Sequence, residues 1–375
     1  IGQDALAAGS LANQIMFILN LVYAGISSGV IMLAAQYWGK NDTKTIENIM
    51  GIAMQLSVAI SSVFFILAFF FPGFLMHIFT NDTNLTISGI PYLRVVSFSY
   101  LLMSFSQVYL CTMRSVERVN FSTVAYTGAF LLNIILNATF IFGFFGLPKL
   151  GIIGVALATV IARGIELTIC IIDNFIPKSI HFRIKTVFNT NKVLFLDFLK
   201  YSMPAFGNEI VWGIAFSMYS VIMGHLGGDI VAANSVVVVA RNFGTVVCFG
   251  IANAGAIILG KSIGSGNSDT VKADSSHFLK ITALSALLGS IVIFVLRPIF
   301  SNMATLTPTA RDYLSIMLYI SMYYIWGQAL NTAFICGIFR SGGDSKWGFI
   351  CDIIDKWCYS VPLGFISAFV LKLPP

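Results

Sequence analysis

Ten runs of apolar residues, each long enough to cross a lipid bilayer, occupy most of this chain. They fall at roughly 10–36, 48–77, 90–113, 121–143, 151–175, 195–224, 230–260, 276–303, 312–339 and 347–371. A helix needs about 20 apolar residues to span a hydrocarbon core of roughly 30 Å, and the runs exceed the strands of about ten alternating residues that build a barrel. Only 10% of the residues are charged, whereas a soluble domain carries about 25%. The sequence therefore predicts an all-α integral membrane protein and excludes a water-soluble globule.

Lysine and arginine lie mainly in connections on one side of the predicted membrane. Fourteen of the 22 basic residues fall on one side and five on the other when alternate connections are grouped. The richer group consists of the connections at 36–47, 114–120, 176–200, 261–280 and 340–346. Because connections rich in Lys and Arg stay in the cytoplasm, the richer side is predicted to be cytoplasmic, and both chain ends face outward. This placement accounts for the net charge of +6 without a nucleic-acid partner.

The first part of the chain repeats after 225 residues. Residues 1–53 align without gaps to residues 226–278, and connection residues such as Asp4 and Gly39 meet identical residues in the second copy. Two halves of the same orientation that are joined by a basic connection are a transporter architecture, in which the substrate is held between the two bundles. The repeat therefore indicates transport across the membrane.

The repeat also predicts where the bundles begin and end. We expect an N-terminal bundle at 1–175, a basic cytoplasmic linker at 176–195 and a C-terminal bundle at 196–375. A helix at 201–224 precedes the second copy but none precedes the first, and the chain stops where a counterpart of the helix at 151–175 would follow. The expected fold is thus two pseudo-symmetric helical bundles in a parallel 6+6 repeat, of which ten of twelve transmembrane helices are present and the first and last are lacking.

Three carboxylates and an arginine inside predicted spans form a first group of candidates. Ionisable groups in hydrocarbon are costly unless they are paired or hydrated, which makes them candidates for function. Glu209 can bind a proton or Na⁺ in such surroundings. Asp352 and Asp355 are three residues apart on one helix face, where they can share a cation or proton, unless Lys356 neutralises one of them. Arg241 has no acidic neighbour on its own helix, so it is a candidate partner for Glu209 or Asp352.

Two amides form a second group of candidates. Asn133 and Asn137 are one helical turn apart and point the same way, and Thr159 in the next span is a candidate of the same kind. Such side chains hydrogen-bond either to a substrate or to neighbouring helices. Aligning the sequence around Asn133 with that around Asp352 predicts that these two residues occupy equivalent positions in the repeat.

Several motifs resemble those of one transporter family, the multidrug and toxic compound extrusion (MATE) family, over essentially the whole chain. These motifs are Ala-Ala-x-Ser at the start of the repeat, Asn133-x-x-x-Asn137, the Gly151–Thr159 segment, Arg340-Ser341-Gly342-Gly343-Asp344 and Val361-Pro362-Leu363-Gly364. The resemblance implies an antiporter that expels organic, usually cationic and amphipathic compounds in exchange for Na⁺ or H⁺. We accordingly expect a monomer in the plasma membrane, the inner membrane of a bacterium, with no cofactor besides the coupling ion.

The resemblance also bears on the coupling residues. Some branches of the family carry an Asp that binds the proton at the second amide position, where this chain has Asn137, which makes coupling in the first half doubtful. Several branches carry a Glu in the helix that holds Glu209. The resemblance therefore favours Glu209 with Asp352 and Asp355 as the coupling residues, and Glu209 and Asp352 as ligands if the ion is Na⁺.

Two other functions are consistent with a membrane chain of this kind. A flippase for lipid-linked oligosaccharide precursors has a related fold, but its cavity is usually richer in Arg and Lys. Here the intramembrane bases are Arg163, Arg241 and Lys356, each with a possible acidic partner, and Glu166 three residues after Arg163 predicts a self-neutralising pair. A membrane enzyme is the third alternative, but the chain lacks nucleotide-binding, zinc-protease and serine-nucleophile motifs. We therefore expect a transporter that is not an enzyme.

Overall fold

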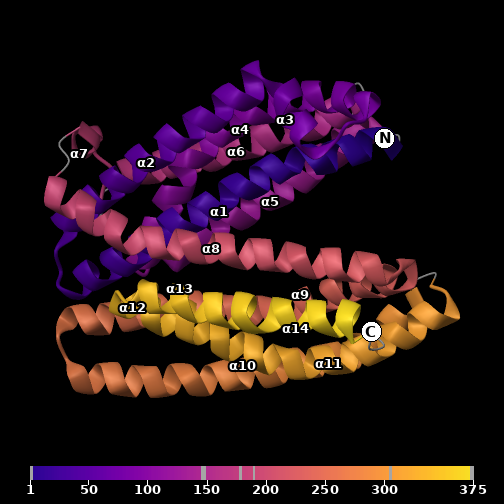
Figure 1. Ribbon diagram of the computed structural model, residues 1–375. Helices are drawn as coiled ribbons and strands as arrows, with labels where there is room; N and C mark the ends of the chain where they lie inside the picture. The colour runs from indigo at the N-terminus through magenta and orange to yellow at the C-terminus, as the bar shows by residue number, and fades with distance from the viewer. Residues whose placement is uncertain (1–2, 145–148, 177–179, 189–190, 304–305, 372–375) are drawn as a thin grey trace. The chain divides into compact units, whose positions relative to one another are not determined.

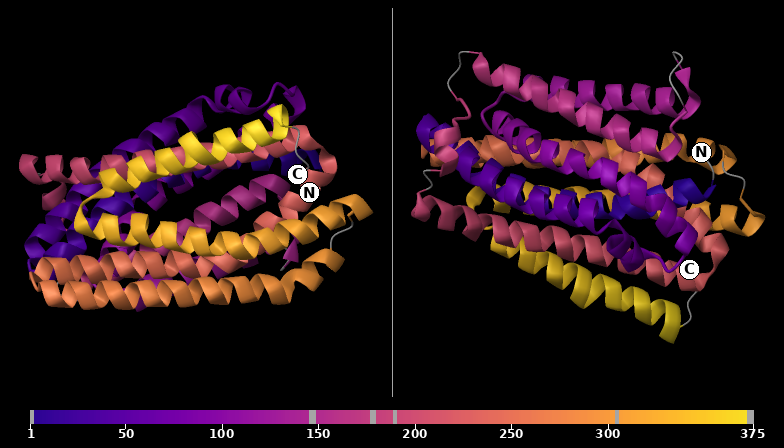
Figure 2. Two further views of the ribbon diagram at one scale, coloured as in Figure 1. Left: turned by 60° about the horizontal axis from the view of Figure 1, so that its bottom comes forward. Right: turned by 90° about the horizontal axis from the view of Figure 1, so that it is seen from above.

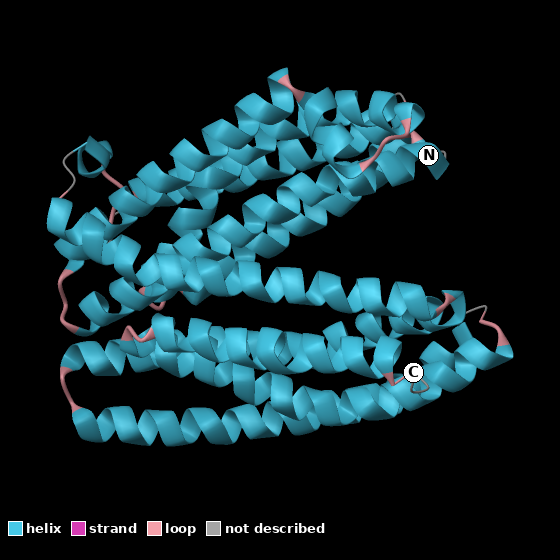
Figure 3. Ribbon diagram, viewed as in Figure 1, coloured by secondary structure: helices cyan, strands magenta, loops and turns pink. Residues whose placement is uncertain are grey.

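Helices account for nearly all of the structure, a computed structural model that describes residues 3–144, 149–176, 180–188, 191–303 and 306–371 (Figure 3). In chain order the first helices are α1 (Gln3–Gly39), α2 (Thr43–Phe70), α3 (Pro72–Phe79), α4 (Thr83–Ser115), α5 (Val119–Phe142), α6 (Gly151–Phe175), α7 (Ile184–Phe188) and α8 (Lys192–Leu226). The remainder are α9 (Gly228–Ser265), α10 (Ser268–Met303), α11 (Pro308–Thr332), η2 (Ala333–Phe339), α12 (Arg340–Gly342), α13 (Ser345–Ile353), η3 (Ile354–Ser360), α14 (Val361–Phe365) and η4 (Ile366–Val370), where η marks π-helix. The predicted all-α membrane fold is thus confirmed.

Nine helices in the described ranges are long and apolar enough to cross a membrane. The predicted span at 312–339 is helical as well, as α11 and η2, but it is not among the nine. Tyr, Ser, Gln and Asn interrupt its apolar residues. The predicted run at 48–77 is broken into α2 and α3, because Pro72 has no backbone N–H to continue the helix and instead occupies its first turn.

The chain divides into two compact units, residues 1–202 and 203–375. The division falls within α8 and not in the connection before it. The reason is the close contact between α8 and α1, where a Cβ atom added at Gly29 would lie 1.9 Å from Oγ of Ser202 and 3.1 Å from Phe198. The glycine lets the beginning of α8 pack against α1 as part of unit 1.

In unit 1, α4 is the helix against which most of the others pack, and Figure 1 shows it next to α2 and α6. It packs against α1, α2 and α6, and α5 packs on α6. Hydroxyl groups join these helices: the Tyr23 hydroxyl lies 2.5 Å from Oγ of Ser61 and donates to the Tyr100 carbonyl at 3.1 Å. Such hydrogen bonds add to the packing in lipid, where burial of apolar side chains gives no driving force between helices.

In unit 2, α9, α10 and α11 lie side by side (Figures 1 and 2). The core between them contains Val237, Ile293, Leu314, Leu318 and Ile325, all nearly inaccessible. The segment that follows α11 changes from α-helix to π-helix at Ala333. A π-helical turn accommodates one additional residue, and such turns are frequent at functional sites.

Candidate functional sites in each bundle

Asp352 is a buried carboxylate of unit 2 that is held by amides. The residue is 4% exposed. Asn208 of α8 donates to one carboxylate oxygen at 2.6 Å, and Asn331 of α11 donates to the other at 3.4 Å. Among the described residues, Asp352 has no ion-pair partner. A buried carboxylate that forms no ion pair is costly in the interior of a membrane protein, which makes Asp352 a candidate for function.

Glu209, the residue after Asn208, pairs with a base that the sequence analysis did not single out as its partner. Its carboxylate lies 3.4 Å from Nη2 of Arg340, which is 8% exposed. The predicted partner Arg241 instead lies over two aromatic rings, 5.1 Å from the ring centre of Tyr324 and 6.0 Å from that of Phe216. Partner choice across helices depends on their rotation, which the composition of the spans does not reveal.

Asp355 lies in a different environment from Asp352. Its side chain is 43% exposed and pairs with Nζ of the neighbouring Lys356, so the two aspartates do not share one site. The alternative in which Lys356 neutralises Asp355 describes the structure. No group of three or more His, Cys, Asp or Glu side chains in the described ranges is arranged to hold a metal, so a cation at Asp352 would take its other ligands from amide or carbonyl oxygens.

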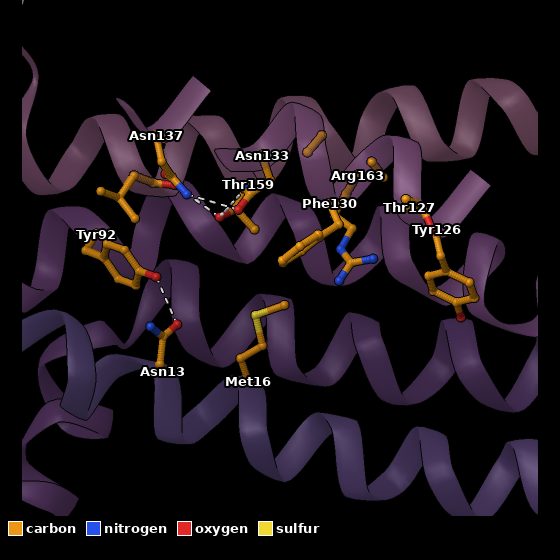
Figure 4. Close-up of a pocket in the computed structure, with 13 residues that line it drawn as sticks. Asn13, Met16, Tyr92, Tyr126, Thr127, Phe130, Asn133, Asn137, Thr159 and Arg163 are labelled. Atoms are coloured by element: carbon orange, nitrogen blue, oxygen red, sulfur yellow. Dashed lines mark hydrogen bonds between the residues drawn. The ribbon is translucent and has the colours of Figure 1, made fainter. Parts of the chain in front are cut away.

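A cavity of about 590 Å³ in unit 1 contains the predicted amide group (Figure 4). Asn133 donates to Oγ of Thr159 at 3.4 Å, and Asn137 donates to the Asn133 side-chain oxygen at 3.0 Å. The sequence analysis missed Asn13 and Tyr92, which line the same cavity and share a hydrogen bond of 2.9 Å. The three predicted residues are thus brought together by α5 and α6.

The predicted pair of Arg163 and Glu166 is present at the same cavity. Their Nη1 and Oε2 atoms are 2.7 Å apart, as the spacing of three residues on α6 allows. Glu166 is completely buried, and its Oε1 has no partner in the described part of the chain. Arg163 is 25% exposed on its side chain and lines the cavity. Glu166 therefore lies behind the arginine and Arg163 faces the open space.

A second ion pair fixes the helices that build this cavity. Arg118, which precedes α5, donates to both carboxylate oxygens of Asp173 on α6 at 2.9 and 3.0 Å, and Tyr109 of α4 donates to the same carboxylate at 2.7 Å. The adjacent Asp173 raises the pKa of Arg118, so the guanidinium stays charged. Three helices of unit 1 are thereby held at one point.

The helix starts correct the predicted repeat register. α1 and α9, α2 and α10, and α4 and α11 each begin 225 residues apart, whereas α5 and α13 begin 226 apart, at Val119 and Ser345. The π-helix η2 between them accounts for the additional residue. With an offset of 226, Arg340 corresponds to Arg114, and Asp352 corresponds to Tyr126 rather than to Asn133. The prediction that Asp352 and Asn133 are equivalent is therefore wrong by about two helical turns.

Comparison with known proteins agrees with this fold. The MatE family profile matches residues 1–139 and 204–366. The chain is 23% identical to the probable multidrug resistance protein YoeA of Bacillus subtilis, over 100% of this chain and 81% of that protein, and 24% identical to the probable multidrug resistance protein NorM of Rhizobium meliloti, over 100% and 80%. These relatives do not favour the flippase alternative.

Solved structures give the same result for the fold. An outward-facing multidrug resistance MATE family transporter superimposes with a TM-score of 0.87 at 18% identity, over 98% of this chain and 81% of that one. A MATE structure in the straight conformation gives a TM-score of 0.88 at 19% identity, over 99% and 82%. Because the family profile matches most of the residues and the helices form the same fold, the chain belongs to the MatE family of multi-pass membrane transporters.

Proposed function

We propose that this transporter expels amphipathic organic compounds in exchange for Na⁺ or H⁺, and that Asp352 of unit 2 is the coupling group. The observation that carries the proposal is the environment of Asp352, a 4% exposed residue whose carboxylate has two amide donors and forms no ion pair in the described ranges. The names of the relatives, which are multidrug resistance proteins, support efflux as the direction of transport.

A cation at Asp352 would reduce the cost of a buried carboxylate that forms no ion pair. A proton would do so by converting the carboxylate to an acid. Na⁺ would do so by direct coordination, with side-chain oxygens of Asn208 and Asn331 within reach after their amides rotate. Both events change the hydrogen bonds that now join α13 to α8 and α11, because a protonated carboxyl becomes a donor at one oxygen and a coordinated carboxylate shares its oxygens with the ion. Occupancy by the cation therefore changes how these helices are held together.

Glu209 takes part through its pair with Arg340. The 3.4 Å separation of their charged atoms is longer than that of a tight ion pair, which is about 2.8 Å. A positively charged substrate can therefore compete with Arg340 for the carboxylate. This competition is the basis on which we propose organic cations among the substrates, together with the aromatic rings of Trp212 and Phe216, which stack on each other in the same unit.

Exchange by the purified protein in liposomes tests the proposal. Ethidium is loaded on one side, and a Na⁺ or a proton gradient is imposed in separate experiments. We expect one gradient to drive ethidium exchange by the wild type, and Asp352→Asn and Glu209→Gln to abolish it. Asp269→Asn, an exposed carboxylate in the first turn of α10, is the matched control and keeps wild-type exchange. Unaltered exchange by the Asp352 variant would refute the coupling role.

A further inference from the structure

A narrow groove of unit 2 lies between α9 and α10. Its volume is about 210 Å³, which is below the range of about 300–1,000 Å³ that is usual for drug-sized ligands. Ala254 and Ile258 of α9 and Ile281 of α10 form its exposed walls. Phe278 forms its floor, since a Cβ atom added at Gly255 would lie 2.2 Å from Cε2 of that ring. The groove therefore suits a slender apolar chain and not a bulky substrate.

The groove has one polar end. Among the described residues that line it, Asp274 and His277 alone have polar side chains. Both lie within the first three turns of α10, next to the connection from α9. Lys280 follows His277 by three residues and adds a positive charge on the same side of the helix. From here to Ile251 the described lining is apolar, so the groove has the character of a binding site for an amphipathic molecule.

The groove runs along the helices, as the lipid chains of a bilayer do. Ser262 of α9 donates to Oδ2 of Asp274, which places the polar end of the groove level with Ser262. The eleven residues from Ile251 to Ser262 extend about 16 Å along α9, which is half of a hydrocarbon core of roughly 30 Å. The polar end lies at the connection that its basic residues predict to be cytoplasmic. The groove therefore has the length and direction of an acyl chain in the cytoplasmic leaflet.

The acidic and basic groups follow one another in a fixed order along α10. Asp274 is nearest the helix start, His277 lies three residues or about 4.5 Å further into the membrane, and the apolar wall at Ile281 follows. In phosphatidylethanolamine the ammonium group is likewise outermost, the phosphate comes next and the acyl chains follow. A carboxylate accepts hydrogen bonds from an ammonium group, and an imidazole N–H donates to a phosphate oxygen. The two sequences of charge are complementary.

Asp274 keeps acceptor capacity for an ammonium group. Its bond with Ser262 occupies one position on Oδ2, whereas an ionised carboxylate offers about four acceptor positions on two oxygens. His277 and Lys280 are exposed, so a phosphate beside the groove can reach both. Phosphatidylglycerol has the same phosphate but no ammonium group, and it would meet the Asp274 carboxylate without a complementary charge.

We propose that the groove between α9 and α10 binds phosphatidylethanolamine of the cytoplasmic leaflet. The ammonium group lies at Asp274, the phosphate lies at His277, and one acyl chain lies along Ile258 and Ile281. The lipid contacts both helices and so adds to the bond between Ser262 and Asp274 at this end of unit 2. The site is distinct from the candidate coupling group and does not depend on which compounds are transported.

Phosphatidylethanolamine and phosphatidylcholine with identical acyl chains are a matched pair of probes. Both are zwitterionic and share the phosphate, but only the ethanolamine nitrogen carries hydrogens that it can donate. The purified protein is stripped of lipid and titrated with each lipid in detergent, and native mass spectrometry measures the dissociation constant of the first bound lipid. We expect phosphatidylethanolamine to bind about fivefold more tightly, as one charge-assisted hydrogen bond allows. Equal binding of the two lipids would overturn the proposal.

Variants assign this preference to Asp274. In Asp274→Asn the amide oxygen still accepts the bond from Ser262, so the contact between the helices is kept while the charge is removed. We expect the fivefold preference for phosphatidylethanolamine to disappear. Asp269→Asn, an exposed carboxylate in the first turn of the same helix, is the matched control and keeps the preference. A preference that survives in Asp274→Asn would contradict the assignment of the ammonium group.

His277 and the apolar wall are tested separately. We expect His277→Ala to weaken the binding of both lipids about threefold and to leave their ratio unchanged, since the phosphate is common to both. Ala254→Phe places a ring in the groove from an exposed position, and we expect it to weaken both lipids about fivefold. Unchanged binding by Ala254→Phe would reject the groove as the lipid site.

Phosphatidylglycerol separates this site from a general attraction of anionic lipid to the basic side of the protein. We expect the wild type to bind phosphatidylglycerol more weakly than phosphatidylethanolamine, and Asp274→Asn to reduce the difference. Tighter binding of phosphatidylglycerol by the wild type would overturn the proposal in favour of an anionic lipid. These measurements use neither an ion gradient nor a transported compound, so failure of the lipid site and failure of the efflux function are separate results.

Discussion

The contact between α9 and α10 at Gly244 and Gly289 provides a stability prediction that the structure makes quantitative. A Cβ atom added at Gly289 would lie 2.4 Å from the Gly244 carbonyl oxygen and 3.2 Å from Cγ2 of Ile325. The first neighbour is backbone, so it can move only if the two helices separate. Glycines at such positions let membrane helices approach closely.

The expected cost of Gly289→Ala is the balance of two effects. Overpacking of a tight interior costs about 1–3 kcal/mol, and replacing Gly by Ala inside a helix returns about 0.5–1 kcal/mol. We therefore expect a net loss of about 1 kcal/mol, within a range of about 0–2.5 kcal/mol. Gly250→Ala in α9 is the matched control, because a Cβ atom there meets nothing within 4 Å. It should gain about 0.5–1 kcal/mol.

Thermal unfolding of the purified protein in detergent, followed by intrinsic fluorescence, measures both variants against the wild type. We expect a lower midpoint for Gly289→Ala and an equal or higher midpoint for Gly250→Ala. A Gly289→Ala midpoint at or above that of the wild type would refute the argument that backbone contact between α9 and α10 leaves no room for a methyl group.

Two further predictions concern unit 1. Arg163→Gln alone leaves the buried Glu166 without its partner and should destabilise the protein by about 3–5 kcal/mol. The double variant with Glu166→Gln should recover most of this loss. Equal thermal unfolding midpoints for the single and double variants would contradict the pairing. Asp42 accepts hydrogen bonds from N and Oγ1 of Thr45 at 3.1 and 2.6 Å as the N-cap of α2, so Asp42→Ala should cost about 1 kcal/mol. These bonds lower the pKa of Asp42 below its ordinary 3.8, so its contribution to stability is complete above pH 3.8 and is lost as the pH falls below that value. A difference in unfolding midpoint between wild type and variant that does not shrink in acid would be inconsistent with a capping carboxylate.

The sequence predicted the fold well because long apolar runs identify membrane-spanning helices directly. Their ends were less predictable: the break before Pro72 lies inside a continuous apolar stretch, and only the rigid φ of proline and its missing N–H reveal it. The π-helix η2 has no comparable signal, yet it shifts the register of everything that follows by one residue.

The candidate sites were predicted in part: contacts between residues close in sequence were predicted, and contacts between residues on different helices were not. Spacings within one helix, such as Asn133 with Asn137 and Arg163 with Glu166, give neighbours directly, and the structure has both contacts. Contacts between helices depend on rotation and register. The sequence therefore did not identify Arg340 as the partner of Glu209, although a correct repeat register relates Arg340 to Arg114.

Direct cation binding tests the central claim most closely. Purified protein is titrated with radioactive sodium at several pH values, and in parallel the proton released on addition of ethidium is measured in unbuffered solution. The account predicts that the wild type either binds sodium saturably or releases a proton when ethidium binds, and that Asp352→Asn does neither. Sodium binding or proton release by Asp352→Asn at the wild-type level would contradict the assignment of Asp352 as the coupling group.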